Sequence, residues 1–403
     1  MDIYIGRQPI LNKRQKTVAY ELLYREGPKN EFPNIESHEA TSKLLHNLFA
    51  SFGLNEVSLK RPVFINFGKQ MLLSGLPHFN PKSVVVEILE GIKFDSDLIK
   101  AFKMLVKKGF KLALDDYILE DSSLPILPLA SIVKIDWKRD SLDEIKRILD
   151  QTKKFNLTLL AEKIETKEQF KLAKQMGFSL FQGYFFARPS IIKGRGLSSN
   201  ELTRVQLLAT INKKEVEIKE LIKIIKHDIA LIYKLLKIIN SASYGLSRKI
   251  SSVEEAVILL GLDELKKWLS IILVSDMAQE KTDALLNLAL VRANFCENLA
   301  KLGQIEEISS KAFLTGLLSM LPAILNYSLE NILKDLPVEP DIISALLKRD
   351  GILGQILTLA ESYENIKEKQ IVQSSIDLKM SQAEVTNCYL KALKKADSYC
   401  ELI

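Results

Sequence analysis

Short apolar runs recur through the first half of this chain, and most of them end in a polar or acidic side chain. They lie at residues 17–24, 63–66, 84–88, 112–115, 132–135, 157–162 and 178–181. Several, such as VVVEI at 84–88, are too apolar for a strand with one face in water, which indicates a parallel sheet buried on both faces. Amphipathic stretches predicted as helices lie between them, at 38–52, 95–108, 142–155 and 167–176. Repeated strand–helix units of this kind predict a doubly wound sheet or a barrel.

The second half of the chain has a different pattern. Residues 189–200 contain two glycines and a cluster of polar residues, which is typical of a domain boundary. Beyond them apolar residues recur at helical spacings, as in Leu221, Ile224 and Ile225, and we find no convincing strand pattern. We therefore predict an α/β domain at 1–192 and an all-α domain at 200–403.

Composition narrows the class of protein. Of the 403 residues, 47% are hydrophobic and 26% charged, and the net charge of +6 is the sum of +8 over residues 1–196 (31 − 23) and −2 over the rest (25 − 27). This balance suits a globular protein with an anionic ligand, and the dispersed basic residues do not indicate nucleic-acid binding. The most apolar stretch, residues 312–328, includes Pro322 and Asn326 and is expected to be a buried helix, not a membrane span. Three widely spaced cysteines favour a reducing cytoplasm.

The polar residues at the ends of the apolar runs suggest one shared site. They are Glu21, Asn66, Glu87, the pair Asp115-Asp116, Lys134, Glu162 and Gln182. In a barrel of parallel strands, active sites form where the C-terminal strand ends meet. Buried carboxylates are costly unless they are paired or bind a metal, and oxygen ligands favour Mg²⁺ or Mn²⁺ over zinc. The pattern therefore predicts a metal site suited to displacement at phosphorus. For any single residue, a cap or salt bridge at the barrel rim is the favoured interpretation, and only the six strands taken together favour a shared site.

The same residues stand in motifs that resemble the EAL domain. In order, the motifs are Gln8-Pro9-Ile10, Glu21-Leu22-Leu23-Tyr24-Arg25, Asn66, Val86-Glu87-Ile88-Leu89-Glu90, Asp115-Asp116, Lys134-Ile135-Asp136, Ala161-Glu162-Lys163-Ile164-Glu165 and Gln182-Gly183-Tyr184-Phe185. The resemblance spans residues 1–190 and is specific, because eight motifs fall in the right order. It implies a TIM-like (β/α) barrel that hydrolyses cyclic-di-GMP to the linear dinucleotide.

The resemblance also implies a role for each site residue. The implied ligands of Mg²⁺ or Mn²⁺ are Glu21, Asn66, Glu87, Asp115 and Asp116. Lys134 and Glu162 would position the water or a second metal, and Glu90 would hold the loop beyond the Asp pair. Gln182 would support the site. Gln8 and Arg25 correspond to positions that contact the dinucleotide, a role that suits the planar fork of an Arg.

Two departures from the EAL pattern bear on activity. Glu21-Leu22-Leu23 replaces Glu-Ala-Leu and keeps the acid. After the Asp pair, Tyr117-Ile118-Leu119-Glu120 replaces Phe-Gly-Thr-Gly, so the glycines that allow unusual backbone angles are missing. In the family this loop couples metal binding to dimerisation. The change therefore puts both turnover and a homodimer in question.

The helical half resembles the HDOD domain, a relative of the HD phosphohydrolases. The resemblance rests on motifs such as Leu260-Gly261-Leu262 and Phe313-Leu314-Thr315-Gly316. His227-Asp228 is not expected to bind metal, because His227 is the only histidine after residue 78. Ser319-Met320 stands where an HD enzyme would carry His-Asp. We predict no hydrolysis here, a packing or capping role for Asp228, and contact with an unidentified protein partner.

Three functions remain open from the sequence. The first is a cyclic-di-GMP phosphodiesterase, favoured by the retained acids. The second is a non-catalytic protein that binds cyclic-di-GMP or a partner protein, favoured by the altered loop. The third, an unrelated metal-dependent barrel enzyme, is disfavoured by the order of the motifs.

Overall fold

A computed structural model of the chain describes residues 3–26, 61–74, 76, 79–90, 92, 94–118, 125–183, 198–213, 215–241, 244, 246, 248–279, 281–334, 338–365 and 367–403. The chain divides into two compact units, Met1–Arg188 and Pro189–Ile403. The helix predicted at 38–52 and most of the predicted boundary segment lie outside the described residues.

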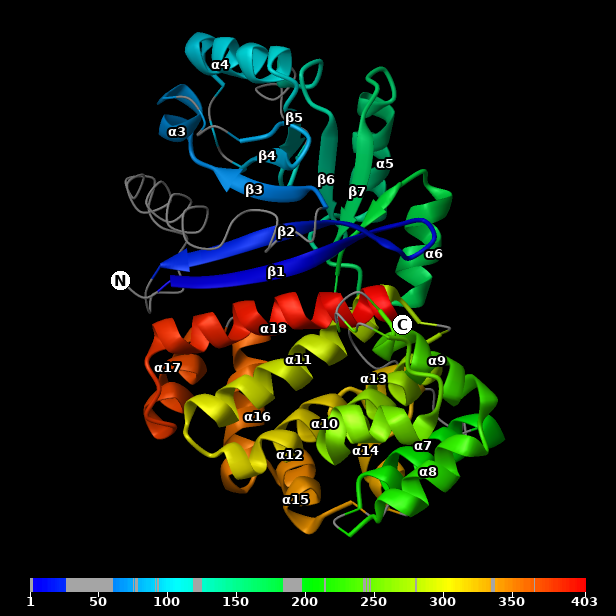
Figure 1. Cartoon of the computed structure of the whole chain (residues 1–403). Coiled ribbons are helices and arrows are strands. Elements are labelled where there is room, and N and C mark those ends of the chain that lie inside the picture. Colours follow the sequence, from blue (N-terminus) through cyan, green and yellow to red (C-terminus); the bar gives the residue numbers. More distant parts are fainter. Residues whose placement is uncertain are drawn as a thin grey trace. The chain divides into compact units, whose positions relative to one another are not determined.

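The first unit is built on a closed barrel of eight strands that follow one another in chain order (Figure 1). The strands are β1 Ile3–Asn12, β2 Thr17–Glu26, β3 Val63–Phe67, β4 Val84–Ile88, β5 Lys111–Leu114, β6 Ile132–Asp136, β7 Thr158–Glu162 and β8 Leu180–Phe181. Neighbouring strands from β2 to β8 are parallel. The barrel architecture confirms the fold class predicted from the sequence.

The strand β1 corrects one detail of that prediction. It pairs antiparallel with β2 on one side and with β8 on the other, so the barrel is not wholly parallel. The sequence analysis missed β1 because Gly6 and Pro9 interrupt its apolar residues, and both residue types are depleted in strands.

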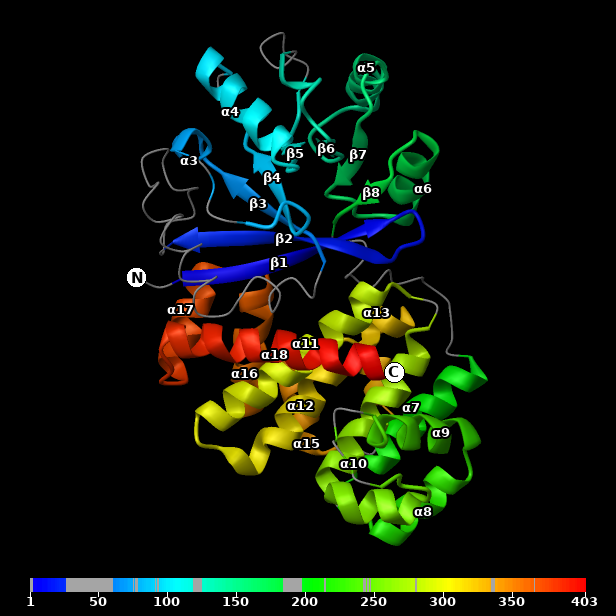
Figure 2. The same cartoon turned by 45° about the horizontal axis from the view of Figure 1, so that its top comes forward.

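Helices lie outside the strands of the barrel, as two views show (Figures 1 and 2). They are α3 Lys69–Ser74, α4 Ser96–Lys107, α5 Leu142–Thr152 and α6 Lys167–Gln175. Capping boxes at Ser141 and Thr166 start α5 and α6, because each cap side chain bonds an amide of the first turn that no helical carbonyl can reach. In α4 the buried residues Leu98, Ala101, Phe102 and Leu105 follow the helical repeat and face the strands.

The barrel interior contains a layer of apolar side chains to which every strand contributes one. The layer comprises Ile10, Ala19, Phe64, Val85, Ala113, Ile132 and Leu160, with the partly buried Leu180 packed against it. Such a filled layer makes the barrel a packed core and not a pore. It closes the interior directly beneath the predicted site.

The second unit is helical throughout its described residues, as the sequence predicted. Its elements are α7 Ser199–Ile211, α8 Ile218–Lys226, α9 Ile229–Ile239, α10 Val253–Met277, α11 Asp283–Leu302, η4 Glu306–Ile308, α12 Ser309–Leu318, α13 Leu321–Leu325, α14 Leu329–Leu333, α15 Pro340–Lys348, α16 Gly351–Glu364, α17 Glu368–Asp377 and α18 Gln382–Leu402. The helix α11 is central to this unit, because α12, α16 and α18 all pack against it.

The stretch Glu306–Leu325 is the one part of the described chain long and apolar enough to resemble a membrane span, and 67% of its most apolar window is buried. It folds as η4, α12 and α13 and is covered by other helices of the unit. Gly316 in α12 lies against α11 so closely that a Cβ there would come 2.9 Å from the Cα of Ala293. These contacts agree with the buried helix expected for residues 312–328.

Candidate active site

Each strand of the barrel, or the position directly after it, supplies one residue to a single polar layer. Each of these residues lies two positions along the chain from a member of the apolar layer, and side chains two residues apart along a strand point to the same face; Asp115 and Gln182 come directly after β5 and β8. The polar layer therefore sits directly on the apolar one. Its members are Gln8, Glu21, Asn66, Glu87, Asp115, Lys134, Glu162 and Gln182.

Lys134 is the centre of this layer. Its side chain is completely buried, and Nζ lies 2.8 Å from Asp115 Oδ1 and 2.8 Å from Glu162 Oε1. The same ammonium bonds Glu87 and lies 3.4 Å from Glu21 Oε2. Four carboxylates far apart in the sequence thus converge on one cation. The structure thus brings together strand-end residues that the sequence predicted to lie near one another.

Two glutamines continue the layer on the side where β1 closes the barrel. Gln182 Nε2 donates to Glu21 Oε2 at 2.6 Å and to Gln8 Oε1 at 2.6 Å. Gln8 and Glu21 are direct partners in the pairing of β1 with β2. This chain of hydrogen bonds orients the Glu21 carboxylate toward the centre of the barrel.

The charges of the cluster do not balance, because one ammonium faces four carboxylates. Burial alone would lower the pKa of Lys134, but the carboxylates, Glu87 foremost, raise that pKa well above its ordinary value. Burial also raises the pKa of Glu87 well above its usual range, with repulsion from Glu21 adding to the effect. For Glu162, burial outweighs the attraction of Lys134 and raises the pKa to about 8. The cluster therefore retains protons at neutral pH that a divalent cation would displace.

The donor atoms of the layer fit a hard divalent cation. Among the described residues, the buried oxygens Asn66 Oδ1, Glu87 Oε2, Asp116 Oδ1 and Gln182 Oε1 accept no hydrogen bond. Buried acceptors of this kind are costly unless something bonds them, and carboxylate and amide oxygens suit Mg²⁺ or Mn²⁺. No three acidic, histidine or cysteine side chains of the described chain surround an open point, because the carboxylates close on Lys134 instead. The Lys134 ammonium lies at the point where the carboxylates converge.

Asp116 lies beside this cluster in a second group of charges. Its φ is +44°, and its carboxylate lies 3.6 Å from Arg139 Nη1 and 3.8 Å from Lys163 Nζ. The mostly exposed Glu90 lies 3.5 Å from Arg139 Nη1 and so reaches the same group. No role was predicted for Arg139 or Lys163. Lys163 stands within the motif Ala161–Glu165, and the signal for Arg139 was its position shortly after the end of β6.

Two sequence predictions fall partly outside the described residues. The backbone of Arg25 pairs with Tyr4 in the hairpin of β1 and β2, and its side chain lies outside the described part of the chain. In the altered loop, Leu119 and Glu120 are likewise outside it. Tyr117 is described: its hydroxyl donates to Gln151 Oε1 at 2.9 Å, and its amide donates to the Lys134 carbonyl at 3.0 Å.

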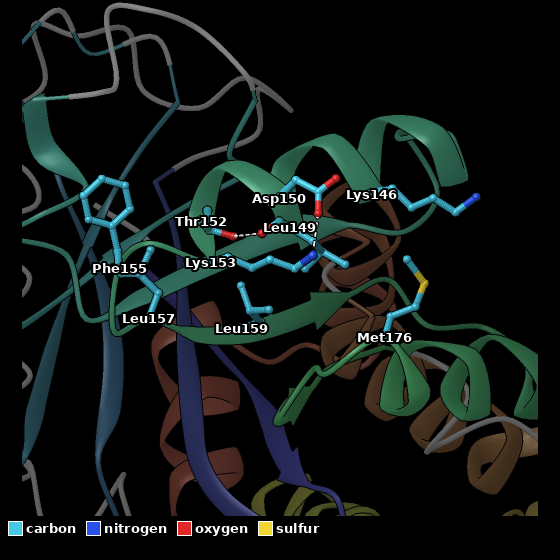
Figure 3. A pocket seen from close by; sticks show the side chains of 9 residues that line it. All are labelled: Lys146, Leu149, Asp150, Thr152, Lys153, Phe155, Leu157, Leu159 and Met176. Atoms are coloured by element: carbon cyan, nitrogen blue, oxygen red, sulfur yellow. Dashed lines mark hydrogen bonds and ion pairs between the residues drawn. The ribbon is translucent and has the colours of Figure 1, made fainter.

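A separate cavity of about 440 Å³ lies on the flank of the barrel (Figure 3). None of the predicted site residues lines it, and it adjoins the early part of β7, away from Glu162 at the end of that strand. Its lysines are paired, as in the 2.6 Å contact of Lys153 with Asp150. The cavity therefore does not belong to the acidic site. It is lined by Lys146, Leu149, Asp150, Thr152, Lys153, Phe155, Leu157, Leu159 and Met176.

In the helical unit, the residues that invited a metal interpretation have structural contacts. Asp228 caps α9, accepting from the Leu231 amide at 3.0 Å, and pairs with Arg204 at 2.8 Å. The predicted capping role of Asp228 is thus confirmed. Ser319 accepts a hydrogen bond from Arg292 Nη1 at 3.0 Å, and that buried guanidinium pairs with Glu364 at 2.6 Å.

Comparison with known proteins identifies both units. The family model of the EAL domain matches residues 35–189, and that of the HDOD domain matches residues 199–331. The chain is 35% identical to the uncharacterized protein YuxH of Bacillus subtilis, over 98% of each chain. It is 36% identical to the cyclic di-GMP phosphodiesterase CdgJ of Vibrio cholerae, over 99% of this chain and 94% of that one.

Among solved structures, the BlrP1 complex of Klebsiella pneumoniae with calcium and cyclic-di-GMP is 23% identical to this chain. It matches 47% of this chain and 56% of its own, with a TM-score of 0.39. The two domain matches and the two full-length relatives establish the family. The chain belongs to the proteins in which an EAL domain is followed by an HDOD domain.

Proposed function

We propose that this protein binds cyclic-di-GMP and Mg²⁺ or Mn²⁺ at the polar layer of the barrel and hydrolyses the dinucleotide to linear pGpG. The observation that carries the proposal is the completeness of the layer: each of the eight strands, or the position directly after it, contributes a polar residue, and four carboxylates face one point. The name of CdgJ, a cyclic di-GMP phosphodiesterase similar over nearly its whole length, supports it.

The reaction adds water to one phosphorus. A bond forms from the water oxygen to phosphorus, the bond to the 3′ oxygen breaks, and that oxygen leaves with a proton. A bound divalent cation supplies charge neutralisation at the phosphate and makes a nearby water more acidic. We assign metal ligation to Glu21, Asn66, Glu87, Asp115 and Asp116.

The remaining residues orient and exchange protons. Lys134 would stabilise negative charge that develops on phosphate oxygen, because a bound cation would draw the carboxylates away from its ammonium. Glu162 would accept the proton of the attacking water, because a cation bound nearby would favour its deprotonated form. Gln182 fixes Glu21, and Gln8 and Arg25 contact the dinucleotide, while Glu90 holds the loop that follows the Asp pair.

We also propose the wider organisation of the protein. The domains extend over residues 1–192 and 200–403, and the helical domain binds an unidentified protein partner and relays the state of the barrel. Its three cysteines form no disulfide, which favours a cytoplasmic location. A homodimer is part of the proposal, although the altered loop is the segment through which the EAL family couples metal binding to dimerisation.

A second function is favoured by one observation, the replacement of Phe-Gly-Thr-Gly by residues 117–120. In that case the protein binds cyclic-di-GMP without turning it over and acts as a receptor. Displacing a metal by about an ångström removes most of the rate of a two-metal reaction, while binding survives.

One assay separates the two functions. Full-length protein is incubated with cyclic-di-GMP and Mn²⁺, and the products are separated by chromatography, with Glu21→Ala as the control. Formation of pGpG by the wild type alone supports the phosphodiesterase. Binding of cyclic-di-GMP in calorimetry without formation of product supports the receptor. If the protein shows no binding and forms no product, both functions are ruled out.

A further inference from the structure

The turn after β6 is tied to the turn after β5 by one side chain, Arg139. Its Nη1 donates to the carbonyl oxygen of Asp116 at 3.1 Å, and its Nη2 to the carbonyl of Tyr117 at 3.3 Å. Nε and Nη2 also bond the Asp140 carboxylate at 2.8 and 3.1 Å. With both edges of the guanidinium occupied, the fork is held in one orientation. The backbone that follows the Asp pair is therefore fixed from outside the altered loop.

The second cation at this place is Lys163, the residue after β7. Its Nζ lies 2.5 Å from Asp136 Oδ2, and its φ of +53° lies in the left-handed region that non-glycine residues seldom adopt. Asp136 Oδ1 in turn accepts from the amides of Lys138 and Arg139 at 2.7 and 3.1 Å. Asp136 thereby joins Lys163 to the turn that carries Arg139. The two cations belong to one connected network and are not independent surface pairs.

Asp116 lies between these two cations. At 3.6 Å from Arg139 and 3.8 Å from Lys163, its carboxylate is attracted by both, yet neither distance is that of a hydrogen bond. The atom Asp116 Oδ1 is buried and accepts no hydrogen bond among the described residues. The carboxylate is thus held in position with a lone pair still available. This is the state required of an oxygen that is to bind a metal.

We propose that Arg139 is a positioning residue that presents Asp116 to a divalent cation, with Lys163 bracing the same carboxylate from the other side. The hydrogen bonds of Arg139 to the carbonyls of Asp116 and Tyr117 fix the turn after β5. In EAL domains with Phe-Gly-Thr-Gly, a glycine-containing loop follows this turn. The inference rests on the proposed metal site, but it does not require that the site turn over.

Two variants separate the geometry of Arg139 from its charge. Arg139→Lys keeps the charge and loses the fork, and Arg139→Met loses both. The control is Lys138→Met, which removes one cation from the same turn. The Lys138 side chain is 69% exposed, and its Nζ lies 3.3 Å from Glu165 Oε1. By Coulomb's law alone, deleting a cation near a metal site strengthens metal binding. A loss of affinity in Arg139→Met therefore reports lost positioning.

The measurement is Mn²⁺ binding to the full chain, followed by electron paramagnetic resonance and calorimetry without dinucleotide. We expect Arg139→Lys and Arg139→Met to bind Mn²⁺ about 10–100-fold more weakly, the range for residues that orient metal ligands. Lys138→Met is expected to bind as tightly as the wild type or slightly more so. In a third variant, Arg139→Ala, which leaves room for the ion, added guanidinium should restore part of the affinity. Circular dichroism verifies that each variant is folded.

The outcomes distinguish this inference from the proposed function. Wild-type affinity in a folded Arg139→Met protein overturns the positioning role, even if the protein hydrolyses cyclic-di-GMP. An equal loss in Lys138→Met also overturns it, because a general disturbance of the turn would then suffice. If the wild type fails to hydrolyse the dinucleotide while the Arg139 variants lose Mn²⁺ affinity, hydrolysis is refuted and the positioning role stands.

Discussion

Replacing Lys134 by Met is the sharpest test of the idea that its ammonium takes the place of a metal. The side chain is fully buried, and Met has a similar length without the charge. The change leaves Glu21, Glu87, Asp115 and Glu162 facing one another without their cation. Removing one partner of a buried ion pair costs about 3–5 kcal/mol, mainly because the remaining charge is buried without compensation.

The lower end of that range applies here. Glu162, with a pKa of about 8, is largely protonated at neutral pH and adds little repulsion. The other carboxylates can also take up protons once the ammonium is gone. For a domain of this size each kcal/mol lowers the melting temperature by about 2–4 °C. A loss of about 3 kcal/mol corresponds to a fall of about 6–12 °C in the barrel transition.

Differential scanning calorimetry in chelator and in Mn²⁺ measures this effect, with Trp137 fluorescence in a Trp268→Phe background assigning the barrel transition. In chelator, Lys134→Met should melt well below the wild type, whereas Glu162→Gln, which mimics a protonated Glu162, should melt close to it. Mn²⁺ should stabilise Lys134→Met more than the wild type, because the ion no longer competes with an ammonium. Equal melting of Lys134→Met and wild type in chelator would refute the reasoning.

Three further predictions follow from other features. In chelator, the raised pKa of Glu162 means that the folded barrel holds a proton that the unfolded chain releases. The free energy of unfolding should therefore fall by up to about 1.4 kcal/mol for each unit that the pH rises between the unfolded pKa and pH 8. In denaturant titrations, Glu162→Gln should flatten that slope. Gly316→Val should lower the stability of the helical unit by about 2 kcal/mol or more, since a Cβ would meet the α11 backbone, whereas Ser309→Val at the start of α12 should not; calorimetry decides. Thiol titration of the native protein near pH 8 should detect one cysteine of three. Cys400 is exposed, whereas Cys296 and Cys388 are buried, which raises the pKa of each thiol. Rapid labelling of all three would contradict the packing of α11 and α18.

The sequence predicted the site well because strand periodicity and chemistry coincide in it. An apolar run predicts a strand, and the polar residue at its end, such as Glu87 after Val84–Val86, predicts which side chain faces the site. The closing strand β1 had no such signal, since Gly6 and Pro9 disguise it. The central place of Lys134 could not be foreseen either, because four pairings with residues distant in the sequence depend on how the barrel closes.

The surroundings of Asp116 show a second limit. Nothing in the sequence indicates that Arg139 donates hydrogen bonds to the carbonyls of Asp116 and Tyr117 in the turn after β5. Nor does it indicate that Lys163 adopts a positive φ and contacts Asp136. Such contacts depend on turns whose geometry is set by neighbouring strands. Sequence motifs locate candidate metal-binding residues more reliably than they locate the residues that position them.

The antiparallel strand β1 has a consequence for synthesis of the chain. Its second edge is covered only when Leu11 pairs with Phe181, two residues that are 170 positions apart. At about 5–20 residues per second, translation leaves that edge open for roughly 10–30 s. Contacts this distant in sequence also slow folding. A nascent barrel therefore exposes an unpaired strand edge to chaperones and to other nascent chains until β8 emerges, and the interval ends before most of the helical domain has been made.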